Sequence, residues 1–163
     1  VPRGAPAAGP APRRRRGPAT LAQLAPPAAL RVPEGAQWER FTAAARRAFF
    51  EAAFTVSAAS DRMGVRLDGA VLETPGGGRM ITEGMPLGAI QVPPGGQPVV
   101  LFVDHQTTGG YPVIASVIAA DLPHVGQLRP GARVRFEEVG LDAARSLLAA
   151  QEAWLAAPDF LPA

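Results

Sequence analysis

Short apolar runs, separated by glycine, proline and polar residues, recur through most of the chain. Between Met63 and Gly69 apolar and polar side chains alternate strictly, which predicts a half-buried strand with Met63, Val65 and Leu67 facing inward and Arg66 and Asp68 facing outward. Other short runs predict further strands at residues 30–32, 54–57, 79–82, 89–93, 98–103, 111–119 and 133–139, with Gln91 on the face opposite Ile90 and Val92. The run 111–119 is apolar at nearly every position, so we expect this strand to be buried on both faces. About eight short strands with frequent turns favour a barrel or a sandwich.

Two stretches have helical rather than alternating periodicity. From residue 37 to about residue 52, charged residues fill one face and four apolar residues recur on the other, namely Trp38, Phe41, Ala45 and Phe49. A second helix is predicted from Asp142, which can cap it, to about Ala156. Asp121 can cap a single helical turn over residues 121–124. The sequence therefore predicts a mainly β fold with one or two flanking helices.

Composition divides the chain into a basic tail and a mildly acidic remainder. Residues 1–28 are rich in Pro, Ala, Gly and Arg without an apolar period, which predicts a linker or the end of an upstream half, followed by a folded domain over residues 29–163. The run Arg13–Arg16 can contact nucleic acid or another anionic surface. The tail has no aromatic side chain to stack on bases, so a solvated linker is the favoured interpretation and no nucleic-acid partner is expected.

Several kinds of chemistry are excluded by what the sequence lacks. There is no Cys, hence no disulfide, no thiolate zinc site and no cysteine nucleophile. There is also no Lys, since all 16 basic residues are Arg, which excludes a Walker-type phosphate loop and a biotinylated lysine on this chain. No run of about 18 apolar residues exists, so no membrane partner is expected. The histidines, His105 and His124, are not at metal-ligand spacing, and no metal site is predicted.

The most polar segment between two apolar runs is the loop Asp104–Pro112. Loops of this kind carry function more often than the strands that they join. Its carboxylate, hydroxyls and phenol predict four catalytic candidates, which are Asp104, Thr107, Thr108 and Tyr111. Five residues of this loop and of the preceding segments are predicted to bind the substrate, namely Glu83, Gln91, Gln106, Gly109 and Gly110.

Several of these features have a plainer alternative. Asp104 follows a predicted strand, where its carboxylate either takes part in catalysis or caps the turn through backbone N–H groups. Gly109 and Gly110 permit positive φ angles and a close approach of a ligand to the backbone, which leaves N–H groups for an oxyanion. His105 is the residue type most often used as a general base, but a single loop histidine is more often a surface residue. The run Gly76–Gly78 can cradle phosphate only ahead of a helix, so a hairpin turn is favoured there.

Several segments, taken in order, resemble the biotin-dependent carboxyltransferase/allophanate hydrolase subunit 2 family. They are Ser60–Gly69 (SDRMGVRLDG), Thr82–Gly84, Gly88–Pro93, Gly96–Pro98, Asp104–Pro112 and Ala120–Leu122. The likeness is to the C-terminal half of such proteins and runs from about Leu30 to Val139. The family includes the C subunit of bacterial 5-oxoprolinase, the antagonist of a sporulation-kinase inhibitor and the carboxyltransferase part of urea carboxylase. The resemblance implies a cyclophilin-like β-barrel, which agrees with the strand pattern.

The resemblance implies one of three functions. The first is ATP-dependent hydrolysis of 5-oxoproline to glutamate by a complex of which this chain is one component. The second is transfer of a carboxyl group from carboxybiotin to a urea-like amide. The third is capture of a kinase inhibitor by a regulatory module without catalytic activity.

The resemblance also implies partners and cofactors. The partners would be related 5-oxoprolinase subunits and an upstream half, and ATP would bind either on this chain or on a partner. Biotin would have to arrive on another protein. A cytoplasmic location in a bacterium is expected. Loop 104–112 would then form one wall of a site for a small amide-type substrate.

Overall fold

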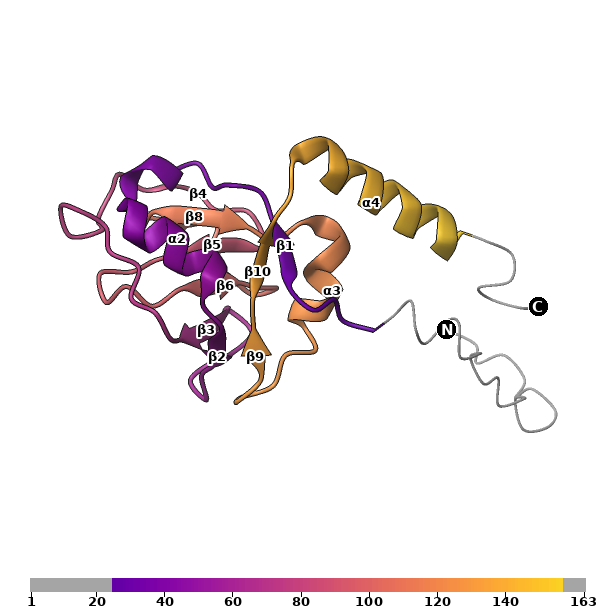
Figure 1. The fold of residues 1–163 in the computed structure, drawn as a ribbon, viewed down its shortest axis with the longest axis horizontal. Coiled ribbons are helices and arrows are strands. Elements are labelled where there is room, and N and C mark those ends of the chain that lie inside the picture. The colour runs from indigo at the N-terminus through magenta and orange to yellow at the C-terminus, as the bar shows by residue number, and fades with distance from the viewer. Residues whose placement is uncertain (1–24, 157–163) are drawn as a thin grey trace, which may run out of the picture.

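A computed structural model of the chain describes residues 25–156, and the fold is mainly β, as predicted (Figure 1). The strands are β1 Leu30–Val32, β2 Phe54–Val56, β3 Gly64–Asp68, β4 Glu83–Gly84, β5 Ala89–Gln91, β6 Val99–Leu101, β7 Thr108–Gly109, β8 Val113–Ser116, β9 Arg133–Val134 and β10 Phe136–Glu138. The helices are the 3-10 turn η1 Trp38–Arg40, α2 Ala43–Glu51, the 3-10 turn η2 Ala119–Asp121, α3 Leu122–Val125 and α4 Leu141–Leu155.

The strands close into a barrel. Six of them form an antiparallel sheet in the order β8-β5-β6-β3-β2-β9, and β10 follows β9 directly in the chain. Strand β1 pairs in parallel with β10 on one side. On its other side, Ile118 N donates to Arg31 O at 3.0 Å and Ser116 N donates to Pro33 O at 3.2 Å, which joins β1 to the segment of β8. Strand β1 therefore bridges the two edges of the sheet, so that few backbone groups are left unpaired at an edge.

The barrel interior holds the main hydrophobic core. Val65, Val100 and Ile90 lie side by side on β3, β6 and β5, and all three are buried. Helix α2 adds Phe49, whose ring stacks on Phe136 with ring centroids 4.5 Å apart. Alternate residues of a strand point to opposite faces, so this inward row determines which side chains the same strands present outside the barrel.

Helix α2 is shorter than predicted. It begins at Ala43 rather than near residue 37, because Thr42 caps it and accepts a hydrogen bond from Ala45 N at 3.1 Å. The preceding turn η1 carries Trp38, whose ring lies 5.7 Å from that of Phe50. The apolar residues predicted for one helix are thus shared between a 3-10 turn and an α-helix.

The observed strands differ from the predicted ones in several details. Residues 79–82 form no strand. Two-residue strands occur instead in segments predicted as loops, since β4 contains Glu83 and β7 contains Thr108, and the two pair with each other. The predicted strand 133–139 is interrupted at Arg135, because β9 pairs with β2 and β10 pairs with β1. Met63 precedes β3 and is half exposed, so it does not face the core.

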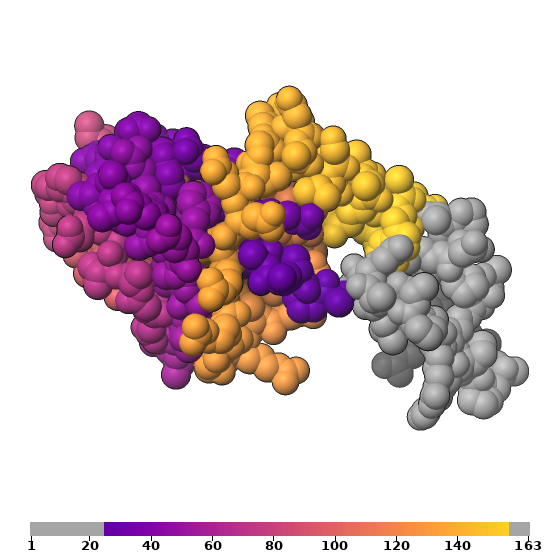
Figure 2. All heavy atoms as spheres, viewed as in Figure 1, coloured from indigo at the N-terminus to yellow at the C-terminus, as the bar shows by residue number. Residues whose placement is uncertain are grey.

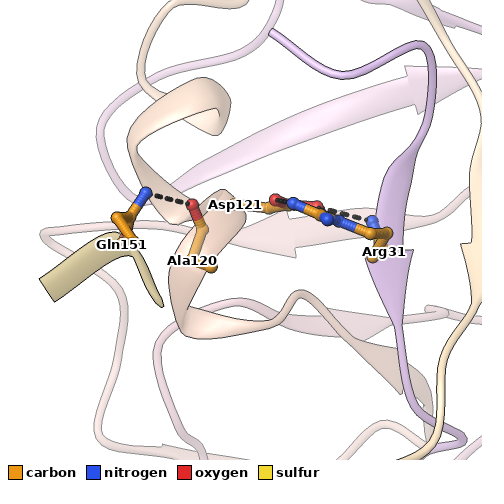
Figure 3. Close-up of polar contacts among 4 residues, drawn as sticks. All are labelled: Arg31, Ala120, Asp121 and Gln151. Carbon is orange, nitrogen blue, oxygen red and sulfur yellow. Dashed lines mark hydrogen bonds and ion pairs between the residues drawn. The ribbon is translucent and has the colours of Figure 1, made fainter. Parts of the chain in front are cut away.

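Asp121 does not cap the turn that follows it. Its side chain instead accepts hydrogen bonds from the Arg31 backbone N at 2.8 Å and from Arg31 Nε at 3.0 Å, and it pairs with the outer guanidinium nitrogen at 2.5 Å (Figure 3). The Asp121 side chain is fully buried. This ion pair links strand β1 to turn η2, on the side of the barrel where β1 completes the ring.

Helix α4 projects from the barrel (Figure 2), and none of its residues is buried. It begins at Leu141 with Gly140 in the N-cap position, so Asp142 is not the cap that was predicted. Gln151 Nε2 donates to Ala120 O at 3.0 Å, which attaches the helix to turn η2 (Figure 3). Within residues 25–156, no helix is long and apolar enough to cross a membrane.

Candidate functional site

The outer face of the barrel carries a row of three side chains opposite to the inward core row. Arg66 on β3 lies across from Val99 on β6, and Val99 lies across from Gln91 on β5. Cross-strand neighbours of this kind point to the same face of a sheet. Arg66 and Gln91 are two strands apart, which separates their backbones by about 10 Å. A guanidinium and an amide therefore stand on one outer surface with an apolar side chain between them.

A solvent-open cleft of about 320 Å³ lies over this row. Its walls come from the turn before β3, from strands β3, β5 and β6, and from loop 104–112. The lining residues are Asp61, Met63, Gly64, Arg66, Gln91, Pro93, Val99, Leu101, Gln106 and Tyr111. Among the nine predicted site residues, Gln91, Gln106 and Tyr111 are brought together here. The other six, which are Glu83, Asp104, Thr107, Thr108, Gly109 and Gly110, do not line the cleft.

Gln91 connects the floor of the cleft to loop 104–112. Its side chain is 3% exposed, and its Oε1 accepts a hydrogen bond from Gln106 Nε2 at 3.0 Å. Its Nε2 donates to Tyr111 O at 3.3 Å and contacts Met85 Sδ at 3.1 Å. A buried amide needs such partners because each polar atom left without a hydrogen bond costs about 1–3 kcal/mol. The prediction that Gln91 faces away from Ile90 is confirmed, and the loop that covers it explains its burial.

Gly109 is needed for close packing rather than for an unusual backbone angle. Neither Gly109 nor Gly110 has a positive φ, so neither uses the backbone freedom that glycine permits. A Cβ atom on Gly109 would lie 2.5 Å from Gln91 Nε2 and 3.0 Å from Met85 Cγ. Gly110 O accepts a hydrogen bond from Met80 N at 2.9 Å. Gly109 thus seats the loop on the buried amide of Gln91, and Gly110 joins the loop to Met80.

Glu83 and the two threonines lie beside the cleft, on the β4–β7 pair. Glu83 is opposite Gly109 in the strand register, and its Oε2 accepts a hydrogen bond from Gln37 Nε2 at 3.0 Å. Gln37 Oε1 in turn accepts a hydrogen bond from Val113 N at 3.0 Å, which ties the β4–β7 pair, called the arm below, to β8. Thr107 and Thr108 are both exposed, at the start of strand β7 in the same arm.

Asp104 is exposed and paired with Arg62. The two nearest atoms, Arg62 Nε and an Asp104 carboxylate oxygen, are 2.5 Å apart. These hydrogen bonds from Arg62 lower the pKa of the Asp104 carboxyl below its ordinary value. Asp104 N also donates to Arg62 O at 3.0 Å. Among the described residues the Asp104 side chain meets a guanidinium rather than the backbone N–H groups of its own turn.

The turn before β3 supplies site residues that the sequence analysis did not select. Asp61 Oδ1 accepts hydrogen bonds from Met63 N at 2.8 Å and from Gly64 N at 3.1 Å, which holds the turn rigid. Arg66 follows, and its guanidinium makes no hydrogen bond or ion pair with residues 25–156. The segment Ser60–Gly69 was noted for its resemblance to a family, and that was the signal that could have placed these residues in the site.

A larger cleft of about 580 Å³ lies between α3 and α4, but two of its polar side chains already have partners. Arg31 is paired with Asp121, and Gln151 donates to Ala120 O. His124 lines this cleft as well, and its Nδ1 is buried without a partner in the described part of the chain. The rest of the wall is mostly apolar, so no set of polar groups converges on a ligand there. The cleft above Arg66 and Gln91 is therefore the candidate site.

A guanidinium that has no partner within residues 25–156, together with a glutamine pair, suits a small ligand that has both an anionic group and an amide. Arg binds carboxylates through two parallel N–H···O bonds. A side-chain amide offers an acceptor and a donor, which match the two polar atoms of another amide. Tyr111 adds a phenol at the edge of the cleft. The arrangement can hold and orient an amide-type molecule, which is a requirement for attack on its carbonyl carbon.

Comparisons with known proteins show the family to which the chain is similar. The profile of the carboxyltransferase domain, subdomains A and B, matches residues 2–138. The chain is 38% identical over 126 residues to the C subunit of 5-oxoprolinase from Haemophilus influenzae, a match that covers 77% of this chain and 41% of that protein. It is also 38% identical over 115 residues to the corresponding 5-oxoprolinase protein of Escherichia coli, covering 71% of this chain and 37% of that protein. The chain thus spans about two fifths of the length of these relatives.

A solved structure extends the likeness to a second kind of enzyme. The crystal structure of Kluyveromyces lactis urea carboxylase superposes with a TM-score of 0.74 at 29% identity, over 78% of this chain and 12% of that one. The match to the family profile begins at residue 2, inside the segment predicted as a linker, and helix α4 lies beyond its end at residue 138. The domain division at residue 28 stays a prediction.

Proposed function

Because this chain belongs to the carboxyltransferase domain family, subdomains A and B, we propose that it is a subunit of a 5-oxoprolinase-type enzyme. In this proposal the complex opens the ring of 5-oxoproline at the expense of ATP. The ring C–N bond breaks, the oxygen of water enters the new carboxylate, and the ring nitrogen becomes the amine of glutamate. A second water is consumed as ATP is hydrolysed to ADP and phosphate.

The observation that carries the proposal is Arg66, a cation without a partner in residues 25–156, in the same cleft as Gln106. 5-Oxoproline carries a carboxylate and a ring amide, so it matches both groups. Arg66 would bind the carboxylate, and the Gln91–Gln106 pair would lie at the amide. Of the predicted catalytic residues, Tyr111 lines the cleft. A catalytic role of Thr107 and Thr108 would need the β4–β7 pair to meet the substrate from the side, and a catalytic role of Asp104 would need the same of the start of loop 104–112.

The loop Gly76–Gly78 does not form a helix-capped cradle for the phosphates of ATP. Gly76, Gly77 and Gly78 have positive φ angles of 83°, 81° and 68°. No helix follows them directly, since the next elements are β4 and β5, so the N–H groups of a helix N-terminus do not join the loop. We therefore place ATP on a partner protein, and the partners would be the other subunits of a 5-oxoprolinase.

The test is glutamate release from 5-oxoproline and ATP by the chain assembled with its partner subunits. We expect Arg66→Gln to raise KM for 5-oxoproline about 10-fold to 100-fold, because a charge-assisted hydrogen bond contributes roughly 1.5–3 kcal/mol. The effect on kcat should be smaller, since the carboxylate does not change during the reaction. Arg47→Gln is the matched control, because Arg47 is an exposed arginine on α2 and does not line the cleft.

Two results would contradict the proposal. One is a complex that forms normally but releases no glutamate. The other is an equal effect of Arg66→Gln and Arg47→Gln on KM, which would show that the cleft does not bind the carboxylate.

A second function is favoured by the superposition on urea carboxylase. In this alternative the cleft binds a urea-like amide and receives a carboxyl group from carboxybiotin. The biotin would have to be attached to another protein, because this chain contains no lysine. Urea carries no negative charge, so Arg66 would then have to bind the transferred carboxyl group. A requirement for a biotinylated protein, together with activity on urea, would distinguish this alternative from the first.

A further inference from the structure

We infer that Gln106 presents its carbonyl oxygen to the cleft, so that the site selects ligands with an N–H donor, and that Gln91 positions it. The inference rests on the proposed function in taking this cleft as the substrate site. It deepens that function, because it states which polar atom of a ring amide is recognised.

The direction of the Gln91 amide follows from its neighbours. Tyr111 O is a backbone carbonyl, which only accepts hydrogen bonds, and it lies 3.3 Å from one end of the Gln91 amide. That end must therefore be the NH₂ group, because two oxygens at this distance would repel each other. The oxygen and nitrogen of a glutamine look alike in most structures, so such an assignment has to come from the partners.

The direction of Gln106 follows from that of Gln91. Since Gln91 Nε2 faces Tyr111, Gln91 Oε1 faces Gln106 at 3.0 Å. Only the NH₂ group of Gln106 can donate to it. Gln106 Oε1 then makes no hydrogen bond with residues 25–156, while Gln106 itself lines the cleft. The ligand therefore meets an acceptor, accompanied by the second N–H of the same amide.

Burial of Gln91 prevents the two amides from flipping. Gln91 is 3% exposed, and rotation of its amide would place its oxygen against Tyr111 O. Gly109 lies directly on the same amide, where a Cβ would come within 2.5 Å of Gln91 Nε2. The rigid buried glutamine thus fixes the exposed one, so Gln106 is held ready before a ligand binds.

This orientation distinguishes a lactam from a lactone. A lactam has a ring N–H that can donate to Gln106 Oε1. The lactone of the same shape has a ring oxygen in that place, and two acceptors would face each other. A site that is built to receive a hydrogen bond rejects an analogue that lacks the donor.

The experiment measures the dissociation constants of 5-oxoproline and of its γ-lactone analogue, in which oxygen replaces the ring N–H, on the assembled complex. We expect the wild type to bind the lactam at least about 10 times more tightly than the lactone. Gln106→Met keeps the length of the side chain and removes the amide, so the ratio should fall to about 2 or less. Gln127→Met is the control, because Gln127 is an exposed glutamine near α3 that does not line this cleft.

A double variant tests the positioning role of Gln91. Gln91→Leu alone should lower the ratio, since Gln106 loses the acceptor that orients it. In the Gln106→Met background the same change should leave the ratio unaltered, because no amide remains to be oriented. A purely structural role of Gln91 would instead weaken both ligands equally and leave the ratio at its wild-type value.

The inference is overturned if the wild type binds the lactone as tightly as the lactam, if it binds neither, or if Gln106→Met and Gln127→Met change the ratio equally. Failure of the proposed reaction would look different. A complex that releases no glutamate, but prefers the lactam in a manner that depends on Gln106, would contradict the 5-oxoprolinase reaction and support the inference.

Discussion

At the scale of single residues, the pair between Arg62 and Asp104 holds the start of loop 104–112 to the turn that precedes β3. The side chains meet through two hydrogen bonds, and a backbone bond from Asp104 N to Arg62 O supports them. Both side chains are well exposed, so the pair contributes little to global stability. Its role is local, because it keeps two walls of the cleft in register.

The lowered pKa of Asp104 gives a prediction with a definite sign. Its pKa in the folded protein lies below that of the unfolded chain, so the ionised pair contributes fully above pH about 4 and is lost as the pH falls through the folded-state pKa. We expect Arg62→Gln to raise the pKa of Asp104 towards its ordinary value. A ¹³C NMR titration of the side-chain carboxyl carbon measures this change. With Arg47→Gln the titration should stay unchanged, and an equal pKa in wild type and Arg62→Gln would refute the explanation.

The candidate site could be predicted only in part from single residues. Gln91 was assigned to the correct face, since alternation along β5 determines which residues oppose Ile90. Its contact with Gln106 could not be foreseen, because it depends on how loop 104–112 folds back over the sheet. Arg66 was recognised as outward-facing, but nothing in the strand pattern indicates that the outer face is covered by a loop at this point.

At the scale of elements, the short β4–β7 pair acts as an arm beside the cleft. A second small hydrophobic cluster supports it from beneath, outside the barrel interior. This cluster consists of Met85, Ala89, Leu101 and Val113, with Val99 packed against it. The arm is also tied through Gln37 to β8, so its position depends on this edge of the sheet.

Gly109→Ala tests the packing of this arm. The new methyl group would meet Gln91 Nε2 and Met85 Cγ, so we expect a loss of about 1–3 kcal/mol in the free energy of unfolding. Urea denaturation measures it. Gly84→Ala is the matched control, because Gly84 is on the partner strand, has no positive φ, and has no atom within 4 Å of the place that a Cβ would take. Equal losses in both variants would show that glycine is not required at residue 109 for packing.

Longer elements were easier to predict than short ones, for a physical reason. Strands β3 and β5 are marked by alternation or by apolar runs because one of their faces is the barrel interior. Strands β4 and β7 have two residues each, which is too short for any period, and they form only because each is the other's partner. The break at Arg135 arises because two different strands pair on either side of it, and pairing partners are not encoded locally.

At the scale of the whole molecule, the buried pair of Arg31 and Asp121 secures the closure of the barrel. Asp121 is fully buried, whereas the Arg31 side chain is 28% exposed. The carboxylate also accepts a hydrogen bond from the backbone of β1. Removing Asp121 leaves a charge without its counter-ion and a backbone N–H without its acceptor. This lowers the free energy of unfolding more than replacing both partners by apolar residues does.

Asp121→Ala should therefore lower the free energy of unfolding by about 3 kcal/mol or more. The double variant Arg31→Met with Asp121→Leu should lose less than the sum of the two single changes, since it leaves no unpaired charge. Urea denaturation of the purified chain gives both values. Asp142→Ala is the control, because that carboxylate is fully exposed and should have no measurable effect. A loss in Asp121→Ala no larger than in this control would show that the pair does not hold the barrel together.

The position of β1 also has a consequence for the order in which the chain folds. Leu30 lies opposite Phe136, so the pairing that completes the ring joins residues from the two ends of the described sequence. Contacts of such long sequence separation form slowly, because a long loop has to be closed before they stabilise anything. During synthesis on the ribosome, β1 leaves the exit tunnel long before β10 exists. The first strand of the barrel to be made therefore forms its parallel pairing only once the last strand, β10, exists.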